Sequence, residues 1–113
     1  MPERSQSLRV ILADDHVTVR HGLKLLIDSQ ADMKVVAEAS DGEAAIRKAL
    51  ELKPDVIVMD ISMPGMNGLA ATRALKKAQP AARIVTLTRH ADDAYLQELL
   101  RAGVSGYVLK RSA

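Results

Sequence analysis

Polar side chains follow directly after the short apolar runs of this sequence, in positions where they could do chemistry together. They are Asp14, Asp15, Asp60, Thr88 and Lys110. Parallel strands of an open α/β sheet all end at one edge, and ligands bind beyond that edge. If the apolar runs are such strands, the spacing predicts that three carboxylates, one hydroxyl and one ammonium group lie close together.

Three neighbouring carboxylates repel one another and require compensating positive charge. A divalent cation supplies it, and oxygen ligands with no histidine or cysteine nearby favour Mg²⁺, which pairs readily with phosphate oxygens. A carboxylate can act as a nucleophile and form an acyl phosphate. Positioning and charge stabilisation are most of what phosphoryl transfer needs. The predicted cluster is therefore typical of a Mg²⁺-dependent phosphoryl-transfer site.

Taken singly, each of these residues also has an ordinary structural explanation. Asp15 is a candidate N-cap for the helix that follows it, and Thr88 is a candidate cap for the fourth helix. Asp60 could order the turn at residues 63–65. Their combination at one sheet edge favours the chemical interpretation over these separate ones.

Histidine and cysteine offer no second site in the sequence. His16, His21 and His90 lack the spacing of a zinc-binding helix motif, and none is placed as a base for Asp60. We interpret His90, two residues after Thr88, as a loop histidine. The chain has no cysteine, which excludes disulfides, thiolate metal sites and cysteine nucleophiles.

The elements that must position these residues alternate along the chain. Apolar runs rich in β-branched residues occur at residues 10–13, 34–37, 56–59, 84–87 and 107–109. They show little alternation of polar and apolar residues, as is typical of strands buried on both faces of a parallel sheet. With right-handed crossovers, the β-α-β-α-β-α-β-α-β order predicts a doubly wound, flavodoxin-like α/β fold with strand order 2-1-3-4-5.

Helical stripes of apolar residues separate the predicted strands. The stripes are Val19, Leu23, Leu26 and Ile27; Ala45, Ile46, Ala49 and Leu50; Ala71, Ala74, Leu75 and Ala78; and Leu96, Leu99 and Leu100. Gly103 is predicted to close the fourth helix. Only four residues follow the fifth strand, so we expect no fifth helix, a partly uncovered sheet face and association into a homodimer.

Length and composition fit one globular domain. We expect residues 1–7 to be disordered and residues 8–113 to form the domain. No apolar run approaches the ~18 residues of a membrane span, and the N-terminus lacks a signal-peptide core, so the sequence predicts a cytoplasmic protein. The net charge of +2 is spread along the chain and only two residues are aromatic, so no nucleic-acid surface is predicted on the domain itself.

Segments of the sequence resemble bacterial two-component response-regulator receiver domains across residues 8–110. They are residues 11–16, 39–45, 56–68, 86–88 and 106–110, in that order, and the third, VIVMDISMPGMNG, is the most specific. His16 after the acid pair and the final GYVLK are similar to the subfamily whose receivers precede a LuxR-type helix-turn-helix domain.

The resemblance implies roles for the acidic residues. It makes Asp60 the phosphoacceptor, with a phosphohistidine of a sensor histidine kinase as the donor. It implies that Asp15 binds Mg²⁺ directly and that Asp14 positions the ion through water. The backbone carbonyl of Ser62 would complete the protein ligands.

The resemblance also implies an output. Thr88 would move toward the phosphoryl group, Lys110 would pair with it, and Tyr107 would change its exposure as a switch residue. The altered surface would lie around the fourth helix and fifth strand. It would regulate transcription through a helix-turn-helix domain that is absent from this sequence, with DNA contacted only by that domain.

The sequence departs from many receivers at Arg89, where a small residue is usual, and at Arg111, where proline is usual. Two other functions compete with the receiver. A small Mg²⁺-dependent aspartyl-phosphate phosphatase would need a second acid two residues after the nucleophile, where Ser62 stands. An unphosphorylated pseudo-receiver is disfavoured because every site residue is present. We therefore expect a phosphoacceptor signalling domain and not an enzyme.

Overall fold

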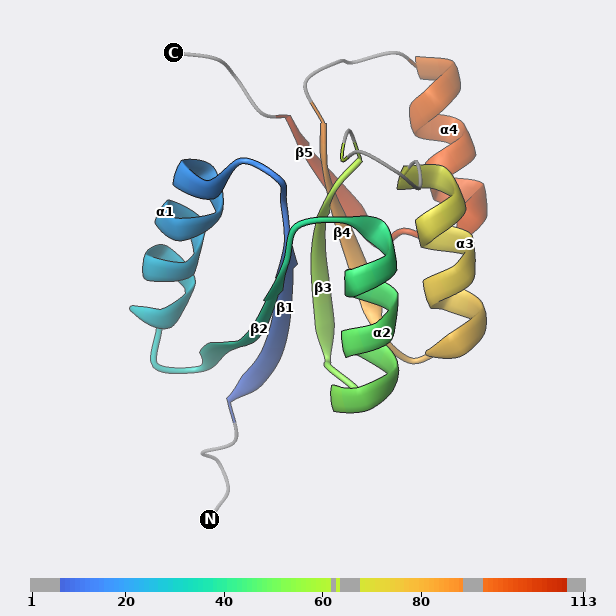
Figure 1. Ribbon diagram of the computed structural model, residues 1–113. Helices are drawn as coiled ribbons and strands as arrows, with labels where there is room; N and C mark the ends of the chain where they lie inside the picture. Colours follow the sequence, from blue (N-terminus) through green and yellow to red (C-terminus); the bar gives the residue numbers. More distant parts are fainter. Residues whose placement is uncertain (1–6, 62, 64–67, 89–92, 110–113) are drawn as a thin grey trace.

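The computed structural model describes residues 7–61, 63, 68–88 and 93–109, without the side chains of residues 93–95 and 109. Within this part of the chain, five parallel strands alternate with four helices (Figure 1). The strands are β1 (Leu8–Ala13), β2 (Met33–Ala39), β3 (Val56–Asp60), β4 (Arg83–Thr88) and β5 (Gly106–Leu109). The helices are α1 (Val17–Asp28), α2 (Gly42–Leu52), α3 (Gly68–Ala78) and α4 (Asp93–Ala102). The strand order β2-β1-β3-β4-β5 confirms the predicted doubly wound sheet.

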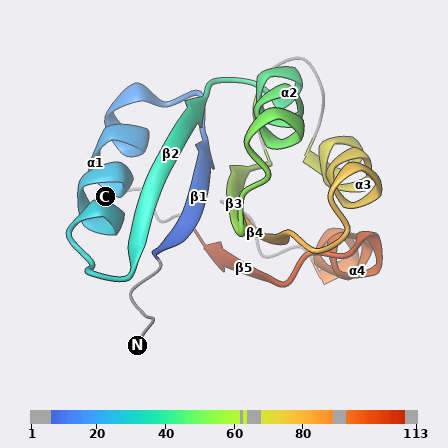
Figure 2. The ribbon, with the colours of Figure 1, turned by 90° about the horizontal axis from the view of Figure 1, so that it is seen from below.

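The main core lies between the sheet and three of the helices. Figure 2 shows α2, α3 and α4 on one face of the sheet and α1 on the other. Ile57, Met59 and Ile84 of the central strands are fully buried on the three-helix face. Ala71 and Leu75 of α3 close over them, which confirms the predicted helix stripe. This packing fixes the positions of β1, β3 and β4, whose carboxyl ends carry the predicted chemistry.

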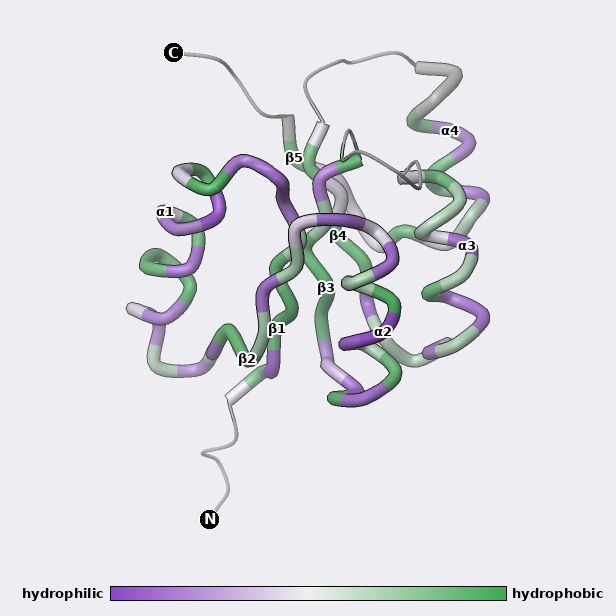
Figure 3. The backbone as a smooth tube through the Cα atoms, in the orientation of Figure 1, coloured by the Kyte–Doolittle hydropathy of each residue, from purple (hydrophilic) through white to green (hydrophobic). Residues whose placement is uncertain are grey.

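The α1 face of the sheet is covered more thinly. None of the residues of α1 is buried, and Leu26 of its predicted apolar stripe is 65% exposed. On β5, Val108 lies opposite Leu87 of β4, and it is 52% exposed. Because side chains alternate along a strand, both point away from the face to which Ile84 belongs. The two faces of the sheet therefore differ in how well they are packed. Figure 3 shows that α1 itself carries hydrophobic as well as hydrophilic positions.

Parts of the predicted helix stripes are wrong at their edges. Leu50 of α2 and Leu100 of α4 are 50% and 51% exposed, although their neighbours Ala49 and Leu99 are buried. One residue turns a helix by about 100°, so adjacent members of a stripe do not share the same contact with the sheet. At the end of α4, Gly103 has φ 109°, and its N–H donates to the Leu99 carbonyl at 3.1 Å, which confirms the predicted cap. Among the helices of the described residues we find no candidate for a membrane span.

A glycine at the start of α3 allows this helix to approach the turn after β3. The Gly68 N–H donates to the Ile61 carbonyl at 3.3 Å. A Cβ at Gly68 would lie 2.4 Å from the Ile61 Cβ and 2.6 Å from its Cα, so helix or turn must move to admit it. We predict that Gly68→Ala lowers the free energy of unfolding by about 1–3 kcal/mol, as overpacking does. Urea denaturation measures this change.

Gly22 of α1 is the matched control. No described atom lies within 4 Å of a Cβ built at that position. Gly22→Ala should therefore leave stability unchanged or raise it by up to about 1 kcal/mol, because alanine favours helix. Equal stability of the Gly68→Ala protein and the parent would contradict the close approach.

Candidate functional site

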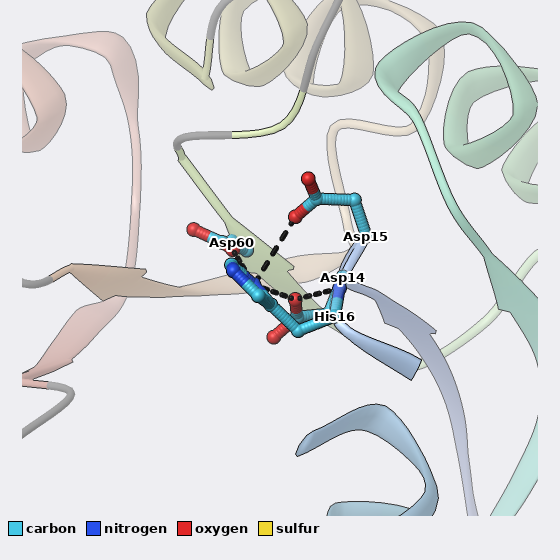
Figure 4. A group of neighbouring side chains, drawn as sticks. All are labelled: Asp14, Asp15, His16 and Asp60. Atoms are coloured by element: carbon cyan, nitrogen blue, oxygen red, sulfur yellow. Dashed lines mark hydrogen bonds and ion pairs between the residues drawn. The ribbon is translucent and has the colours of Figure 1, made fainter. Parts of the chain in front are cut away.

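Three carboxyl groups meet at the carboxyl edge of the sheet, as the spacing predicted. β1 and β3 are neighbours, with Ala13 opposite Met59, so Asp14 follows one strand where Asp60 ends the other. Asp14 is fully buried and Asp60 is 1% exposed. The side chain of Asp15 keeps 31% of its surface exposed. Figure 4 shows the three carboxyl groups grouped around the side chain of His16.

The other predicted site residues are placed only in part. Thr88 ends β4, one position beyond the pairing of Leu87 with Asp60, and it is 2% exposed. It therefore reaches the same edge as the carboxylates. Tyr107 lies on β5, opposite Thr86, and is 44% exposed. Ser62 and Lys110, together with Arg89, His90 and Arg111, lie outside the described residues.

His16 is a site residue that the sequence analysis missed. Its Nδ1 lies 3.1 Å from Asp14 Oδ1, 3.2 Å from Asp15 Oδ1 and 3.6 Å from Asp60 Oδ2. The expectation of a carboxylate cluster with no histidine nearby is therefore wrong (Figure 4). The available signal was the position of His16 directly after the acid pair. The direction of the ring, however, depends on how the chain turns from β1 into α1.

That turn is held by hydrogen bonds to Asp14. The His16 N–H donates to Asp14 Oδ1 at 2.8 Å, and the Asp14 N–H donates to the carbonyl of Ala39 at 3.0 Å. From α1, Arg20 donates through a guanidinium nitrogen to the Asp14 carbonyl at 2.8 Å and through Nε to Glu38 Oε1 at 3.0 Å. Because these bonds tie the turn to both β2 and α1, the Asp14 carboxyl has a fixed direction.

Helix capping does not explain Asp15. α1 begins at Val17 with His16 as its N-cap, and no side chain accepts a capping hydrogen bond there. Asp15 Oδ1 is buried and, within the described part of the chain, has no partner that meets hydrogen-bond geometry. The contact of 3.2 Å with His16 Nδ1 is within the range of an ion pair but does not satisfy that oxygen as a hydrogen bond would. A buried carboxylate oxygen in this condition suits a bound cation.

The donor set of the cluster fits a divalent ion. Asp14, Asp15, His16 and Asp60 each offer one ligand atom, and these atoms all lie within 4.8 Å of one another. Carboxylate oxygens are the ligands that Mg²⁺ prefers, and this ion keeps several waters with only one or two direct carboxylates. The three carboxylates supply enough negative charge for such an ion and for a cationic group besides.

The chain matches a known protein family. The family model of the response regulator receiver domain matches residues 10–113. The chain belongs to this family of receiver domains. The match includes both the acid pair after β1 and Asp60 at the end of β3.

Related proteins indicate the subfamily of receiver domains that this chain resembles. The oxygen regulatory protein NreC of Staphylococcus haemolyticus (strain JCSC1435) is 44% identical over 106 residues, which are 93% of this chain and 49% of that protein. The receiver thus spans about half the length of the curated relatives it matches. This relative and the LuxR-family structures confirm the predicted LuxR-type subfamily.

Solved structures agree with the receiver fold. A LuxR-family two-component response regulator from Aurantimonas sp. SI85-9A1 has a TM-score of 0.88 and 42% identity, covering 95% of this chain and 76% of that one. The signal receiver domain of the putative response regulator NarL from Mycobacterium tuberculosis has a TM-score of 0.89 and 31% identity, covering 96% and 87%. Family membership does not favour the phosphatase or the pseudo-receiver.

Proposed function

We propose that this receiver accepts a phosphoryl group on Asp60 from a phosphohistidine of a sensor histidine kinase, with Mg²⁺ bound. The observation that carries the proposal is the position of Asp60, 1% exposed at the carboxyl edge of the sheet beside Asp14 and Asp15. Phosphorylation then changes the surface formed by α4 and β5. The chain acts as a phosphoacceptor in signalling, with no turnover of other substrates.

The transfer is a substitution at phosphorus. A carboxylate oxygen of Asp60 forms the new P–O bond, the P–N bond to the kinase histidine breaks, and its electron pair leaves with the imidazole. Mg²⁺, when bound, neutralises charge on the carboxylates and on the phosphoryl oxygens. Asp15 and Asp60 would hold the ion as direct carboxylate ligands, Asp14 would position it through water, and the Ser62 carbonyl would complete the set.

Two further residues act on the transferred group. The hydroxyl of Thr88, at the end of β4, donates a hydrogen bond to a phosphoryl oxygen. The ammonium group of Lys110 pairs with the same group, because a phosphorylated side chain carries a charge of about −1.5 to −2. These assignments rest on the resemblance to receivers and, for Thr88, on its position at the edge where Asp60 ends.

The partners follow from the subfamily. A LuxR-type regulator carries its DNA-binding function in an effector domain, so we propose that this receiver contacts DNA only through such a domain. The similarity to NreC and to a DNA-binding LuxR-family regulator from Staphylococcus aureus supports this. A kinase-controlled transcription regulator acts in the cytoplasm, where we place the protein.

Phosphorylation of Asp60 is tested by intact mass after incubation with acetyl phosphate and Mg²⁺. The mass should rise by one phosphoryl group, and both Asp60→Asn and EDTA should abolish the rise. Asp32→Asn, at an exposed carboxylate before β2, should leave it unchanged. Incorporation that survives in the Asp60→Asn protein would show that another residue is the acceptor.

Assays on the same protein samples distinguish the receiver from the phosphatase and from the pseudo-receiver. A phosphatase would hydrolyse a generic phosphate ester over many turnovers, whereas a receiver would not. A pseudo-receiver would gain no mass under any of these conditions. Sustained ester hydrolysis would therefore contradict the proposal, and so would the absence of phosphoryl incorporation by the wild-type protein.

The switch predicts a coupling between Thr88 and Tyr107. When the hydroxyl of Thr88 moves toward the phosphoryl group, the space it leaves is open to the ring of Tyr107, which is 44% exposed in this structure. We expect the Tyr107 ring resonances to shift on addition of the phosphomimetic BeF₃⁻, and Thr88→Ala to abolish the shift. Thr72→Ala, a buried threonine of α3, should retain it. An unchanged Tyr107 in the BeF₃⁻-bound wild type contradicts this route.

We also propose that the chain forms a homodimer through its α1 face. On this face Leu26 of α1 is 65% exposed and Val108 of β5 is 52% exposed, and exposed apolar patches mark surfaces for association. Sedimentation should show a dimer that Leu26→Glu converts to a folded 12.2 kDa monomer. Leu50→Glu is the matched control, because Leu50 is 50% exposed on α2, across the sheet. A wild-type monomer at high concentration refutes the dimer.

A further inference from the structure

The imidazole of His16 occupies a defined place among the three carboxyl groups of the site (Figure 4). Its Nδ1 is 3.1 Å from Asp14 Oδ1, 3.2 Å from Asp15 Oδ1 and 3.6 Å from Asp60 Oδ2. The ligand atoms of all four residues lie within 4.8 Å of one another. The side chain of His16 is 40% exposed, so the ring borders the site and is open to solvent on its other side.

These separations are those between ligands that share one ion. An octahedral ion with ligands at ~2.1 Å places adjacent ligands about 3 Å apart and opposite ligands about 4.2 Å apart. A tetrahedral ion with nitrogen ligands at ~2.0 Å places them about 3.3 Å apart. The contacts of 3.2 Å to Asp15 and 3.6 Å to Asp60, the two direct carboxylate ligands of the proposed function, are close to the spacing of adjacent ligands. Nδ1 is too far from the oxygens to occupy the ion's own position, which must lie at ~2.1 Å from them.

Hydrogen bonds at the start of α1 fix the backbone of His16 and the carboxyl group that its ring approaches. His16 is the N-cap of α1, with φ −87° and ψ 103°. Its N–H donates to Asp14 Oδ1 at 2.8 Å, the same oxygen that Nδ1 approaches. Arg20 fixes the Asp14 carbonyl at 2.8 Å. A nitrogen donor is therefore preorganised at the metal-binding edge, and little conformational entropy is lost when it binds.

We propose that His16 Nδ1 is a direct ligand of the divalent ion, and that it makes this site select transition-metal ions over Mg²⁺. Imidazole suits zinc, iron, nickel and copper, and affinity rises from Mn²⁺ through Co²⁺ to Cu²⁺, whereas Mg²⁺ binds through carboxylates, carbonyls and water. The inference rests on the metal site of the proposed function and adds its selectivity. At equal concentrations of the ions, the receiver would therefore bind Mn²⁺ or Fe²⁺ more tightly than Mg²⁺.

The test is metal binding by the unphosphorylated full chain. Pulsed EPR of the Mn²⁺-loaded wild type should show hyperfine coupling to an imidazole nitrogen, and His16→Asn should remove it. Asparagine is a favourable N-cap, so this variant keeps the start of α1. By calorimetry, His16→Asn should weaken Mn²⁺ and Co²⁺ binding by about tenfold or more, and Mg²⁺ binding by less than about twofold. His21→Asn, at an exposed histidine of the same helix, should change neither signal nor affinity.

Several outcomes overturn the inference. Absence of nitrogen coupling in the Mn²⁺ wild type does so, as does an equal loss of Mg²⁺ and Mn²⁺ affinity in His16→Asn. A gain in both affinities means that the ring only fills the site in the ion-free protein. In each of these cases, Mg²⁺-dependent phosphorylation of Asp60 can still stand. Failure of the wild type to bind any divalent ion removes the metal from the proposed function and this inference with it.

Discussion

The mutual repulsion of three carboxylates at one sheet edge is the constraint on which the rest of this structure depends. Asp14 and Asp60 are almost completely buried there, and the Asp15 carboxyl joins them. Burial lowers the effective dielectric constant, so the repulsion between like charges is stronger than it would be in water. Such a cluster persists only with positive charge or hydrogen-bond donors around it. In the proposed function, the same unfavourable arrangement would favour binding of a cation and, with the cation bound, of a phosphoryl group.

The turn from β1 into α1 supplies part of the compensation. The His16 ring and backbone N–H both approach Asp14 Oδ1, and Arg20 binds the Asp14 carbonyl while pairing with Glu38 at the end of β2. Because one turn carries two of the acids and their local donors, a change in its path would alter the charge balance and the geometry together. Gly68 affects the geometry at the end of β3. Because it has no side chain, it lets α3 approach Ile61, the residue that follows Asp60.

Packing around this edge differs between the two faces of the sheet. On one face, α2, α3 and α4 bury Ile57, Met59 and Ile84 in a continuous core that fixes the strands. On the other, α1 buries none of its residues. Thr88 ends a strand that is firmly held by this core, while Tyr107 on the edge strand β5 is 44% exposed. In the proposed switch, a small movement of Thr88 would therefore have a partly exposed residue on the adjacent strand that could respond to it, which a close-packed core would not allow.

The sequence by itself determined the strand order, the strand boundaries to within two residues, the presence of four intervening helices, and the meeting of Asp14, Asp15 and Asp60. It could do so because buried parallel strands produce uniform apolar runs, and because parallel strands necessarily end at one edge. Only the tertiary structure decided where His16 points, since the ring direction follows from the turn and from the bonds of Arg20 to β2. It also decided that Leu26, Leu50 and Leu100 are exposed, because burial depends on what packs against a helix and not on its periodicity alone.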